Sequence, residues 1–479
     1  MRQRSRAAAL LTATHLFTAA ALQGARPQPA YPRTVRRATP DRDDEAPRSS
    51  RGASRRAALA AAASATVTQA APARAEIGPD QEYNLWPALP VAPYSRRKTI
   101  RRQLKDDVWV FDQIIGIYYV HVPIRMTVIR GATGLLVYAP VAPTKECLGL
   151  LQELIVKYGP VQTIILPSVA VEHKVLAGPF ARKFPDATFY VVDQQYSFPV
   201  PLPSRFLGLP RWARPLPRSG SVAGGFAHEV LTVKPGPGSY FQDVALYHKR
   251  SKTLCVCDAV LSVTAEPPPI LLEEPEYRRA LLFHARDDAL EVVDDTPENR
   301  RKGWRRIVLL FNFFIPGAVQ ADIGLKPLKA LRKYEYGWGG WQPFAWNEED
   351  EVTSFERYSK NGKLALLPII QIILNRGIDD GSLQKWVDRV CGWDFDTVVP
   401  AHLDAPVKAT PADFREPFQF YKSGSNDVRF CDEDVALLRE AERGPLKFSV
   451  TPTTYGPLVG KKCGIGGRPR VVPFNWTPN

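Results

Sequence analysis

The chain has 479 residues, 45% of them hydrophobic and 23% charged, and its formal net charge is +14. This length and composition predict a globular protein with a large core. The positive charge is concentrated in residues 1–75, which hold 13 arginines, no lysine and four acidic residues, whereas the remaining 404 residues carry a net charge of +5. We therefore expect no nucleic-acid-binding face on the body of the chain.

The first 75 residues have the composition of a multipartite targeting leader. Three arginines precede an apolar run at 7–21, as in a secretory signal, and the Arg-, Pro- and Ser-rich stretch 25–54 is typical of an organelle transit segment. A twin arginine, a second apolar run at 57–67 and a small-x-small site at 73–75 resemble a thylakoid-lumen signal. We expect a plastid protein, in the stroma or thylakoid lumen, whose mature chain begins near Glu76. A disordered alanine-rich tail without a targeting role is the alternative.

Six cysteines are spread along the chain without a CxxC pair, so they provide neither a zinc-finger spacing nor a disulfide framework. Cys255 and Cys257 lie two residues apart on a predicted strand, and their side chains therefore face the same side of it. We expect both to be small buried hydrophobic residues.

Two apolar runs, 307–319 and 364–374, raise the question of membrane insertion. They are 13 and 11 residues long and each contains a proline, whereas a membrane-spanning helix needs about 20 apolar residues. We predict buried helices and no transmembrane span. A surface that touches lipid is the alternative for the first run, because Trp304 and two arginines precede it.

From residue 108 onward the apolar pattern alternates between short strands and amphipathic helices. It predicts strands at 108–111, 125–130, 135–141, 161–167 and 188–192, and helices at 145–158 and 173–183. This alternation is typical of sheets covered by helices.

The second half of the chain continues the pattern with longer interruptions. It predicts a Pro-rich loop at 197–220, strands at 244–248, 254–259 and 397–400, mainly helical structure at 272–335, a Trp-rich loop at 334–346 and a helix at 381–390. The glycine- and lysine-containing tail beyond residue 425 lacks a complete phosphate-loop motif and is predicted to be a loop.

Polar side chains follow three of the predicted strands. Glu172 and His173 come after the predicted strand 161–167, Asp258 lies at the end of the predicted strand 254–259, and His402 follows the predicted strand 397–400. Side chains just beyond strand ends converge at one edge of a covered sheet. Two imidazoles and two carboxylates suit zinc, iron or manganese. Asp404 is a further candidate ligand, although a solvated position is the simpler prediction.

At this point the sequence resembles the metallo-β-lactamase superfamily of metal-dependent hydrolases. The stretches GLLVYAPVAPT (134–144) and QYSFPVPLPSRFLG (195–208) carry a closer resemblance to an uncharacterised plastid and cyanobacterial family within it. The resemblance covers about residues 85–421 and implies an α/β fold, an αββα sandwich with mixed sheets. The predicted organisation is therefore a leader at 1–75, an N-terminal extension at 76–105, this domain at 106–425 and a C-terminal extension at 426–479.

The resemblance places the superfamily's HxHxDH loop on residues 168–173. Glu172 stands for the aspartate and His173 for the last histidine, whereas Ser168 and Ala170 stand where the first two histidines belong. One of the two metal positions of the superfamily has therefore lost ligands.

The later ligands are also only partly present. The resemblance places the bridging aspartate at Asp258 and the final histidine at His402, but the histidine expected near 235–239 is missing. All three histidines of one metal position are absent. The resemblance therefore implies either one ion, held by Glu172, His173, Asp258 and His402, or none.

Two functions remain open. If an ion binds, it lowers the pKa of a bound water toward 7 for attack on an ester, thioester, amide or phosphoester, with Glu172 and Asp258 as the catalytic carboxylates. Glutamate is one methylene longer than aspartate, and a general base needs placement to within about half an ångström. We therefore expect a non-catalytic or weakly active scaffold for a protein partner. A single-metal hydrolase of a small-molecule substrate is the alternative.

The other polar candidates are predicted to be structural. No GxSxG motif surrounds Ser168, so it is not expected to be a nucleophile. His121, His228 and His248 have no partner at metal-ligand spacing. The segment 284–288 is predicted to be a solvated helix face, with Arg286 as an alternative anion-binding group.

Overall fold

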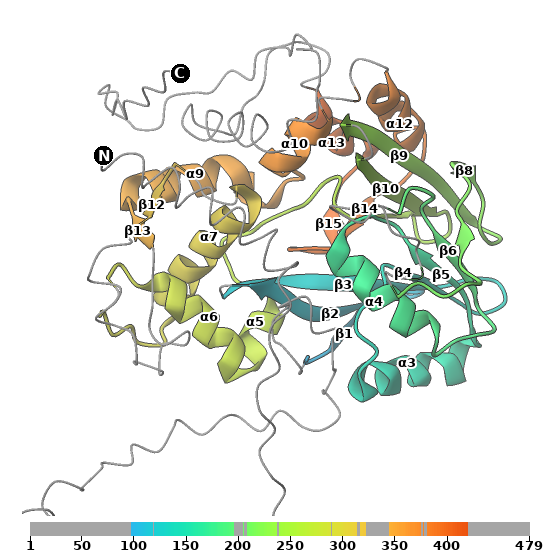
Figure 1. Cartoon of the computed structure of the whole chain (residues 1–479), viewed down its shortest axis with the longest axis horizontal. Helices are drawn as coiled ribbons and strands as arrows, with labels where there is room; N and C mark the ends of the chain where they lie inside the picture. Colours follow the sequence, from blue (N-terminus) through green and yellow to red (C-terminus); the bar gives the residue numbers. More distant parts are fainter. Residues whose placement is uncertain are drawn as a thin grey trace, which may run out of the picture. The chain divides into compact units, whose positions relative to one another are not determined.

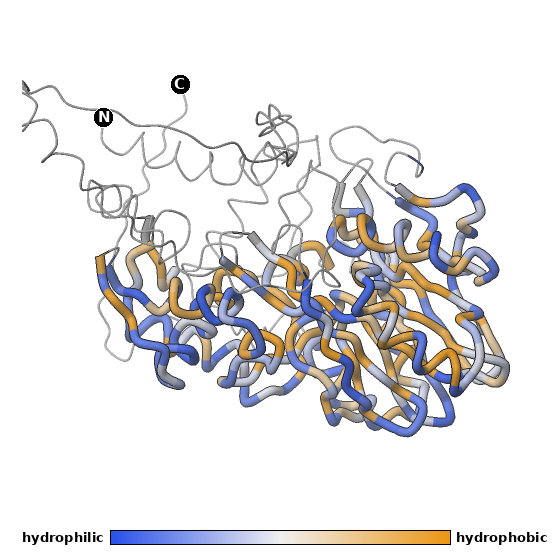
Figure 2. Tube along the Cα trace, turned by 90° about the horizontal axis from the view of Figure 1, so that it is seen from below, coloured by the Kyte–Doolittle hydropathy of each residue, from blue (hydrophilic) through white to orange (hydrophobic). Residues whose placement is uncertain are grey.

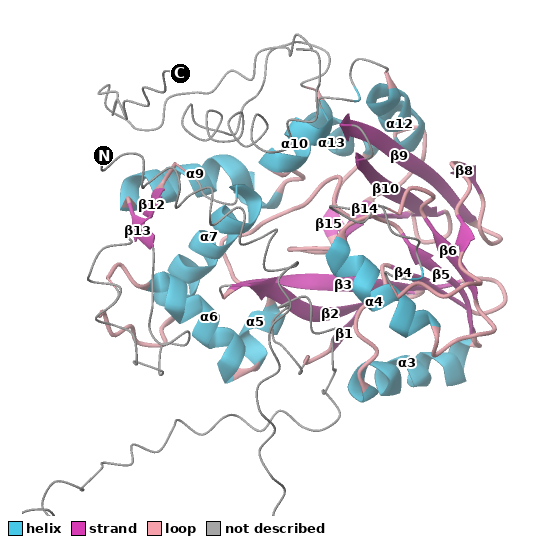
Figure 3. Ribbon diagram, viewed as in Figure 1, coloured by secondary structure: helices cyan, strands magenta, loops and turns pink. Residues whose placement is uncertain are grey.

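The computed structural model describes residues 97–419, with gaps at 118, 196–204, 206–207, 237–238, 289, 314–316, 322–343, 375–376 and 378–380. The predicted leader and the predicted C-terminal extension lie outside the described residues, as does most of the Trp-rich stretch 334–346. Within the described part of the chain, two large sheets form the centre of the fold (Figure 3).

The first sheet contains the strands from the beginning of the described chain. In spatial order these are β1 (Ile100–Lys105), β2 (Val108–Ile117), β3 (Val120–Arg130), β4 (Leu135–Tyr138), β5 (Val161–Leu166), β6 (Thr188–Val191) and β7 (Arg214–Pro215). β1 to β4 pair antiparallel and β4 to β7 pair parallel. The sheet thus begins at Ile100, within the segment predicted as an N-terminal extension, and the β2–β3 hairpin is longer than the strands predicted at 108–111 and 125–130.

The second sheet combines strands from the middle and the end of the described chain. Its order is β15 (Val407–Lys408), β14 (Thr397–Pro400), β11 (Thr253–Val256), β10 (Ser239–His248), β9 (Phe226–Gly236) and β8 (Ser219–Gly220). β11 and β14 pair in parallel, and the other neighbours pair antiparallel. β9 was not predicted, because Lys234-Pro235-Gly236 at its end has the composition of a loop. A small separate sheet joins β12 (Val319–Ala321) to β13 (Phe344–Trp346).

Helices cover the outer faces of both sheets (Figure 1). α3 (Lys145–Tyr158) and α4 (Val171–Ala181) pack on the first sheet, and α12 (Ser382–Val390) packs on β9 of the second. α5 (Pro269–Glu273), α6 (Pro275–Ala285) and α7 (Pro297–Phe313) gather at the ends of β2 and β3, with α9 (Glu348–Ser359) beside α7. The remaining described helices are α10 (Pro368–Leu374), α13 (Pro411–Arg415) and the 3-10 turns η5 (Lys360–Gly362) and η6 (Glu416–Phe418).

The core has two layers because strand side chains alternate between faces. In β4, Leu136 and Tyr138 point between the sheets, where they join Val244 and Leu246 of β10. The other face of each sheet contributes to the larger core beneath the helices, and Figure 2 shows hydrophobic stretches along the strands with hydrophilic residues on many outward loops. Tyr138 donates a hydrogen bond from its hydroxyl to the Val244 carbonyl at 2.6 Å, linking the two sheets. The predicted αββα sandwich is thereby confirmed.

Local sequence signals explain the helix over 145–158, which the structure places at the predicted residues. The Thr144 hydroxyl accepts a hydrogen bond from the Cys147 N–H at 3.0 Å and caps the first turn. Gly159 ends the helix with φ +97°, a conformation that a glycine adopts at low cost. Cys255 and Cys257 are buried between the sheets, as predicted, and burial raises the pKa of Cys255 to about 12.

The described residues of the two apolar runs contribute mainly to the core, and residues 314–316 of the first run lie outside the described residues. Residues 307–310 of α7 are at most 4% exposed, and Leu374 of α10 is fully buried. Within the described residues, no helix has the length and apolar character required to cross a membrane.

The three histidines predicted to be structural are buried in the described fold. His121 is 4% exposed, and burial together with the charge of Arg97 lowers its pKa to about 3. Burial and Arg250 lower the pKa of His248 to about 4. Nε2 of His228 lies 2.9 Å from the Pro217 carbonyl oxygen, which can only accept a hydrogen bond, so Nε2 carries the proton, and burial lowers the pKa of the ring. All three are therefore neutral in the folded protein at neutral pH.

A substitution at His121 should reveal this burial in the pH dependence of stability. Below pH 6.5 the unfolded histidine binds a proton that the folded one cannot hold until about pH 3, so the folded state loses stability as the pH falls through that window. Between about pH 6 and 4, the free energy of unfolding of the wild-type chain should fall by up to about 1.4 kcal/mol per pH unit relative to that of His121→Phe. Urea unfolding at several pH values measures the difference. Parallel curves for the two proteins from pH 8 to 5 would contradict the assignment.

Candidate metal centre

Four polar side chains from separate segments meet at one edge of the sandwich. Glu172 and His173 lie in the first turn of α4 after β5, Asp258 follows β11, and His402 follows β14. One ligand atom from each side chain lies within 4.8 Å of the corresponding atoms of the other three. His173, Asp258 and His402 are buried and Glu172 is partly exposed. The structure thus brings together all four residues that the sequence proposed as metal ligands.

The two imidazoles face each other through their Nε2 atoms, which are 3.0 Å apart. The Nδ1 atom of His402 lies 2.9 Å from the Pro123 carbonyl oxygen, which can only accept a hydrogen bond. His402 therefore carries its proton on Nδ1, and its Nε2 lone pair points toward the cluster. Metal-binding histidines are commonly oriented in this way, by a backbone carbonyl that accepts a hydrogen bond from the other ring nitrogen.

His173 has no equivalent support among the described residues. Its Nδ1 atom is buried without a hydrogen-bond partner, and its Nε2 atom donates to the lone pair of His402. A metal ion at Nε2 would move this proton to Nδ1, where an unsatisfied N–H costs about 1–3 kcal/mol. The chain therefore supports one ligand firmly and the other loosely.

Asp258 is positioned by two neighbours that the sequence analysis did not identify as part of the site. The Ser168 hydroxyl donates to Oδ2 of Asp258 at 3.0 Å, and Oδ1 lies 3.5 Å from Nε2 of His402. The carboxylate of Asp243 accepts hydrogen bonds from the backbone N–H groups of Cys257, Asp258 and Ala259 at 3.1, 2.5 and 2.8 Å. Asp243 thereby fixes the turn that presents Asp258.

Burial perturbs the pKa values of the whole group. Burial raises the pKa of Asp258 to about 6, and burial together with Asp258 raises that of Glu172. The pKa values of His173 and His402 are lowered, chiefly by burial. Lys174, also buried, has its pKa lowered to about 8 by burial, which the charge of Glu172 partly opposes. Burial therefore disfavours the charged form of each of these groups.

The loop that carries His402 is held by a buried arginine of the opposite sheet. Arg125, on β3, is 1% exposed, and its guanidinium donates to the carbonyls of Pro400 and Leu403 at 2.8 Å each. Its backbone N–H donates to Ala401 at 2.7 Å, and its Nε forms a 2.7 Å ion pair with Asp112. The only signal in the sequence was a charged residue within an apolar strand, which does not reveal its partners.

Asp404 is not a member of the group. Its carboxylate accepts a hydrogen bond from the backbone N–H of Thr264, and burial raises its pKa. The prediction of a solvated position was also wrong, because the residue is partly buried beside Arg125 and Arg102. Asp404 helps to close the loop after His402.

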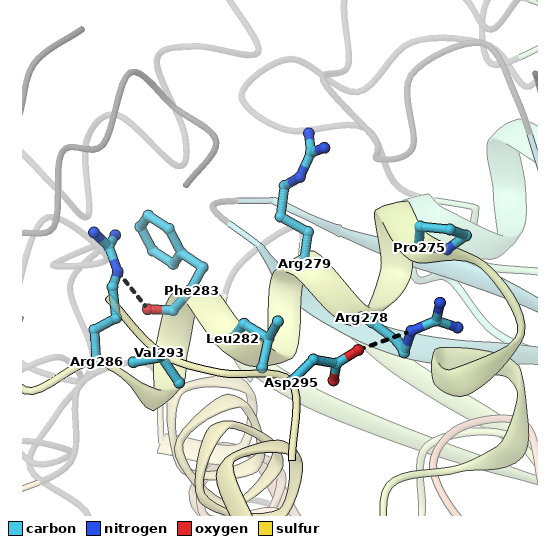
Figure 4. Close-up of a pocket in the computed structure, with 8 residues that line it drawn as sticks. All are labelled: Pro275, Arg278, Arg279, Leu282, Phe283, Arg286, Val293 and Asp295. Carbon is cyan, nitrogen blue, oxygen red and sulfur yellow. Dashed lines mark hydrogen bonds and ion pairs between the residues drawn. The ribbon is translucent and has the colours of Figure 1, made fainter. Parts of the chain in front are cut away.

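The segment 284–288 was predicted to be a solvated helix face, and this was wrong for two of its residues. His284 is 1% exposed and Arg286 is fully buried. Arg286 lines a pocket of about 220 Å³ with Arg278 and Arg279 of α6. Figure 4 shows these three guanidinium groups pointing away from one another, with Arg278 turned to Asp295. The pocket therefore does not focus its positive charge on one point.

Two of the separations within the group suit a single divalent transition metal ion, whereas the limit for all four ligand atoms is 4.8 Å. Zinc bonds of about 2.0–2.2 Å to nitrogen and oxygen require ligand atoms about 3–3.6 Å apart. The Nε2–Nε2 separation of 3.0 Å and the Nε2–Oδ1 separation of 3.5 Å match this requirement. Two nitrogens and two oxygens suit zinc, iron or manganese alike.

Comparison with known protein families identifies the family of the chain. Residues 105–420 match a family described as a domain of unknown function, DUF4336. The chain belongs to this family. No match was found among curated proteins. The DUF4336 match covers both large sheets except residues 100–104 of β1, and it includes all four residues of the cluster.

Several solved structures are similar to the chain at low identity. The DIM-1 metallo-β-lactamase is 8% identical over 68% of this chain and 98% of that one, with a TM-score of 0.34. The metal-soaked Flv1 flavodiiron core from Synechocystis sp. PCC6803 is 12% identical over 68% and 61%, also at 0.34. The mono-zinc form of FIM-1 from Pseudomonas aeruginosa is 11% identical over 33% and 67%, at 0.26. The order and pairing of its own strands give the DUF4336 chain a metallo-β-lactamase-like fold.

Replacing Arg125 should destabilise the DUF4336 domain strongly. Arg125→Met leaves the carboxylate of Asp112 buried with one partner fewer and the Pro400 and Leu403 carbonyls without donors, which should lower the free energy of unfolding by about 3–5 kcal/mol. Urea unfolding followed by circular dichroism measures this. Arg130→Met, on the same strand at a 45% exposed ion pair, is the matched control and should cost less than about 1 kcal/mol. Equal losses in the two variants would contradict the role given to Arg125.

Proposed function

We propose that this protein binds one divalent transition metal ion at Glu172, His173, Asp258 and His402, on a metallo-β-lactamase-like scaffold whose hydrolytic activity is slow or absent. The observation that carries the proposal is the convergence of one ligand atom from each of these side chains within 4.8 Å. A buried group of two carboxylates and two imidazoles is costly unless a cation compensates it. The neighbours described as metallo-β-lactamases and as a flavodiiron core are consistent with the proposal but do not support it by themselves.

The reasons to expect slow chemistry lie in the residues around the cluster. The resemblance places ligands of a second ion at Ser168 and Ala170, neither of which offers an imidazole. Ser168 instead donates its hydroxyl to Oδ2 of Asp258, so that this oxygen already has a partner. Without a second ion, no cation neutralises the leaving oxygen during a displacement.

A single-metal hydrolase is the second candidate, and the exposure of Glu172 favours it. A bound ion would supply Lewis acidity and lower the pKa of a bound water. Glu172 is the partly exposed member of the group, and burial and Asp258 raise the pKa of its carboxyl. A carboxylate with a raised pKa at the mouth of a site can accept a proton from water. In this candidate Glu172 is the base, and the other three residues, His173, Asp258 and His402, hold the ion.

Metal content should separate binding from an empty cluster. The purified full-length chain, dialysed against zinc, iron(II) or manganese(II), should retain about one ion per chain. His173→Ala and His402→Ala should each lower the retained metal to about a tenth of that or less, because each removes one of four ligands. Elemental analysis after gel filtration is the measurement.

His228→Gln is the matched control, since His228 is also buried but bonds to the Pro217 carbonyl away from the cluster. It should retain the wild-type metal content. Metal-free wild-type protein, or equal metal loss in the control, would refute the proposed centre.

Turnover by the metal-loaded chain distinguishes the scaffold from the hydrolase. A panel of chromogenic ester, thioester and phosphodiester substrates would be assayed with loaded and chelator-treated protein. A hydrolase should show metal-dependent cleavage that falls about a hundredfold or more in Glu172→Gln while metal content is retained. Cleavage at the same rate in loaded, stripped and Glu172→Gln protein would refute the hydrolase and leave the metal-binding scaffold.

We also propose that the protein functions in the plastid. The support is the composition of residues 1–75, which hold 13 arginines and no lysine in three successive signal-like segments. N-terminal sequencing of the protein purified from its own cells should find a start near Glu76. Recovery of mature protein that retains residues 1–50 would contradict the proposal.

A further inference from the structure

A second pocket lies beside the candidate metal centre, at the end of β6. It has a volume of about 260 Å³ and is lined by residues 191–193, 195, 205, 209–211, 213 and 215. Gln195, which lines it, lies with Nε2 at 3.5 Å from the Ser168 carbonyl oxygen, and the hydroxyl of the same serine bonds to Asp258. Ser168 therefore links Gln195 of the pocket to Asp258 of the cluster.

The walls of this pocket are fixed by the fold. The Leu216 N–H donates to the Val191 carbonyl at 2.7 Å, and β6 pairs with β7. Gly208 approaches α4 so closely that a Cβ added to Gly178 would lie 2.0 Å from the Gly208 oxygen, and Arg182 donates to that same oxygen at 2.8 Å. The pocket is thus largely preformed, as small-molecule sites usually are.

The charge of the pocket favours a monoanion. Arg205 and Arg211 both line it, and Arg211 forms no ion pair or hydrogen bond with any residue that the structure describes. Burial opposes the ionisation of Asp193, but hydrogen bonds from Gln194 and Gln242 and the nearby Arg218 hold its pKa below the usual range. The fixed charge of Asp193 repels a phosphate dianion more than a carboxylate, which a guanidinium can bind through two hydrogen bonds.

The Gln195 side chain adds a requirement for a hydrogen-bond donor. Its Oε1 atom is buried without a partner, and its Nε2 atom makes only long contacts, at 3.5 Å to Ser168 and 3.3 Å to Val192. A buried acceptor without a donor is costly. An amide N–H or a hydroxyl on a ligand would satisfy it, and Val191, Leu209 and Ala213 provide an apolar wall for a short carbon chain.

We propose that this pocket binds a small organic carboxylate that also carries an amide N–H or a hydroxyl group. Arg211 holds the carboxylate, Gln195 accepts the hydrogen bond, and the apolar wall receives the short carbon skeleton. The site goes beyond the proposed metal centre and stands whether or not an ion binds there.

The probe for this site is N-(trifluoroacetyl)glycine, which carries a carboxylate, an amide N–H and a fluorine label. Titration into chelator-treated full-length protein, followed by ¹⁹F NMR line width, should show saturable binding. Its neutral methyl ester should not bind saturably. Unlabelled acetate should displace the probe more effectively than inorganic phosphate at equal concentration.

Arg211→Met should weaken binding about tenfold or more, because it removes a charge-assisted hydrogen bond at a residue without other partners. The N-methyl derivative of the probe lacks the amide N–H, so the wild type should bind it more weakly than the probe. Gln195→Leu should weaken binding of the probe severalfold and bind the two compounds equally. Lys183→Met, which removes an exposed cation after α4, is the control and should bind as the wild type does.

Absence of saturable binding to the wild type, equal binding of the methyl ester, or unchanged affinity in Arg211→Met would each overturn the proposal. Stronger displacement by phosphate would overturn the choice of a carboxylate. Circular dichroism confirms that each variant is folded. The titration uses metal-free protein, so its outcome is independent of the metal-content measurement. Absence of probe binding would not contradict the metal centre, and absence of metal would not contradict the carboxylate site.

Discussion

The candidate centre depends on a contact between the two sheets at a single edge. His402 belongs to the second sheet, but Arg125 of the first sheet holds the loop on both sides of it, and Ile124 forms a β-bridge with His402 itself. The Pro123 carbonyl, next along the same strand, fixes the imidazole. Three consecutive residues of β3 thus determine the position, the backbone path and the tautomer of one ligand. The cost of burying the Arg125 guanidinium is offset by Asp112 and by the carbonyls, whose hydrogen-bonding capacity would otherwise be unused.

The same edge holds two buried carboxylates, Asp243 and Asp258, whose pKa values are raised chiefly by burial. Asp243 satisfies three backbone N–H groups, yet burial and Asp258 raise its pKa to about 7. Asp258 accepts a hydrogen bond from Ser168, yet burial raises its pKa to about 6. The hydrogen bonds that Asp243 accepts organise the turn after β11 and present Asp258 to the cluster. A bound cation would reverse the electrostatic penalty, since it favours the ionised form of each carboxylate and the neutral form of each imidazole.

The sequence predicted the ligands better than it predicted their support. Strands that end in polar residues are a local pattern, and β5, β11 and β14 place Glu172, Asp258 and His402 as that pattern indicates. The helix over 145–158 was also predictable, because its cap and its terminating glycine lie next to it. β9 was missed because proline and glycine at its end outweigh its apolar residues, although tertiary pairing with β10 overrides that local preference. Arg125 and Asp243 were missed because their partners lie far away in the sequence, and no local pattern encodes such pairs.

Ser168 shows how the loss of a ligand can change the chemistry of those that remain. The resemblance places a histidine at this position, and its replacement alone would leave a gap beside Asp258. The serine hydroxyl instead donates to Oδ2 of Asp258 and accepts from the Ala170 N–H at 3.1 Å, so it links the start of α4 to the aspartate. Of the two Asp258 oxygens, Oδ1 lies 3.5 Å from Nε2 of His402 and Oδ2 accepts the hydrogen bond from Ser168. Ser168 therefore offers no imidazole at this position and engages one oxygen of the Asp258 carboxylate, which supports the proposal of at most one ion.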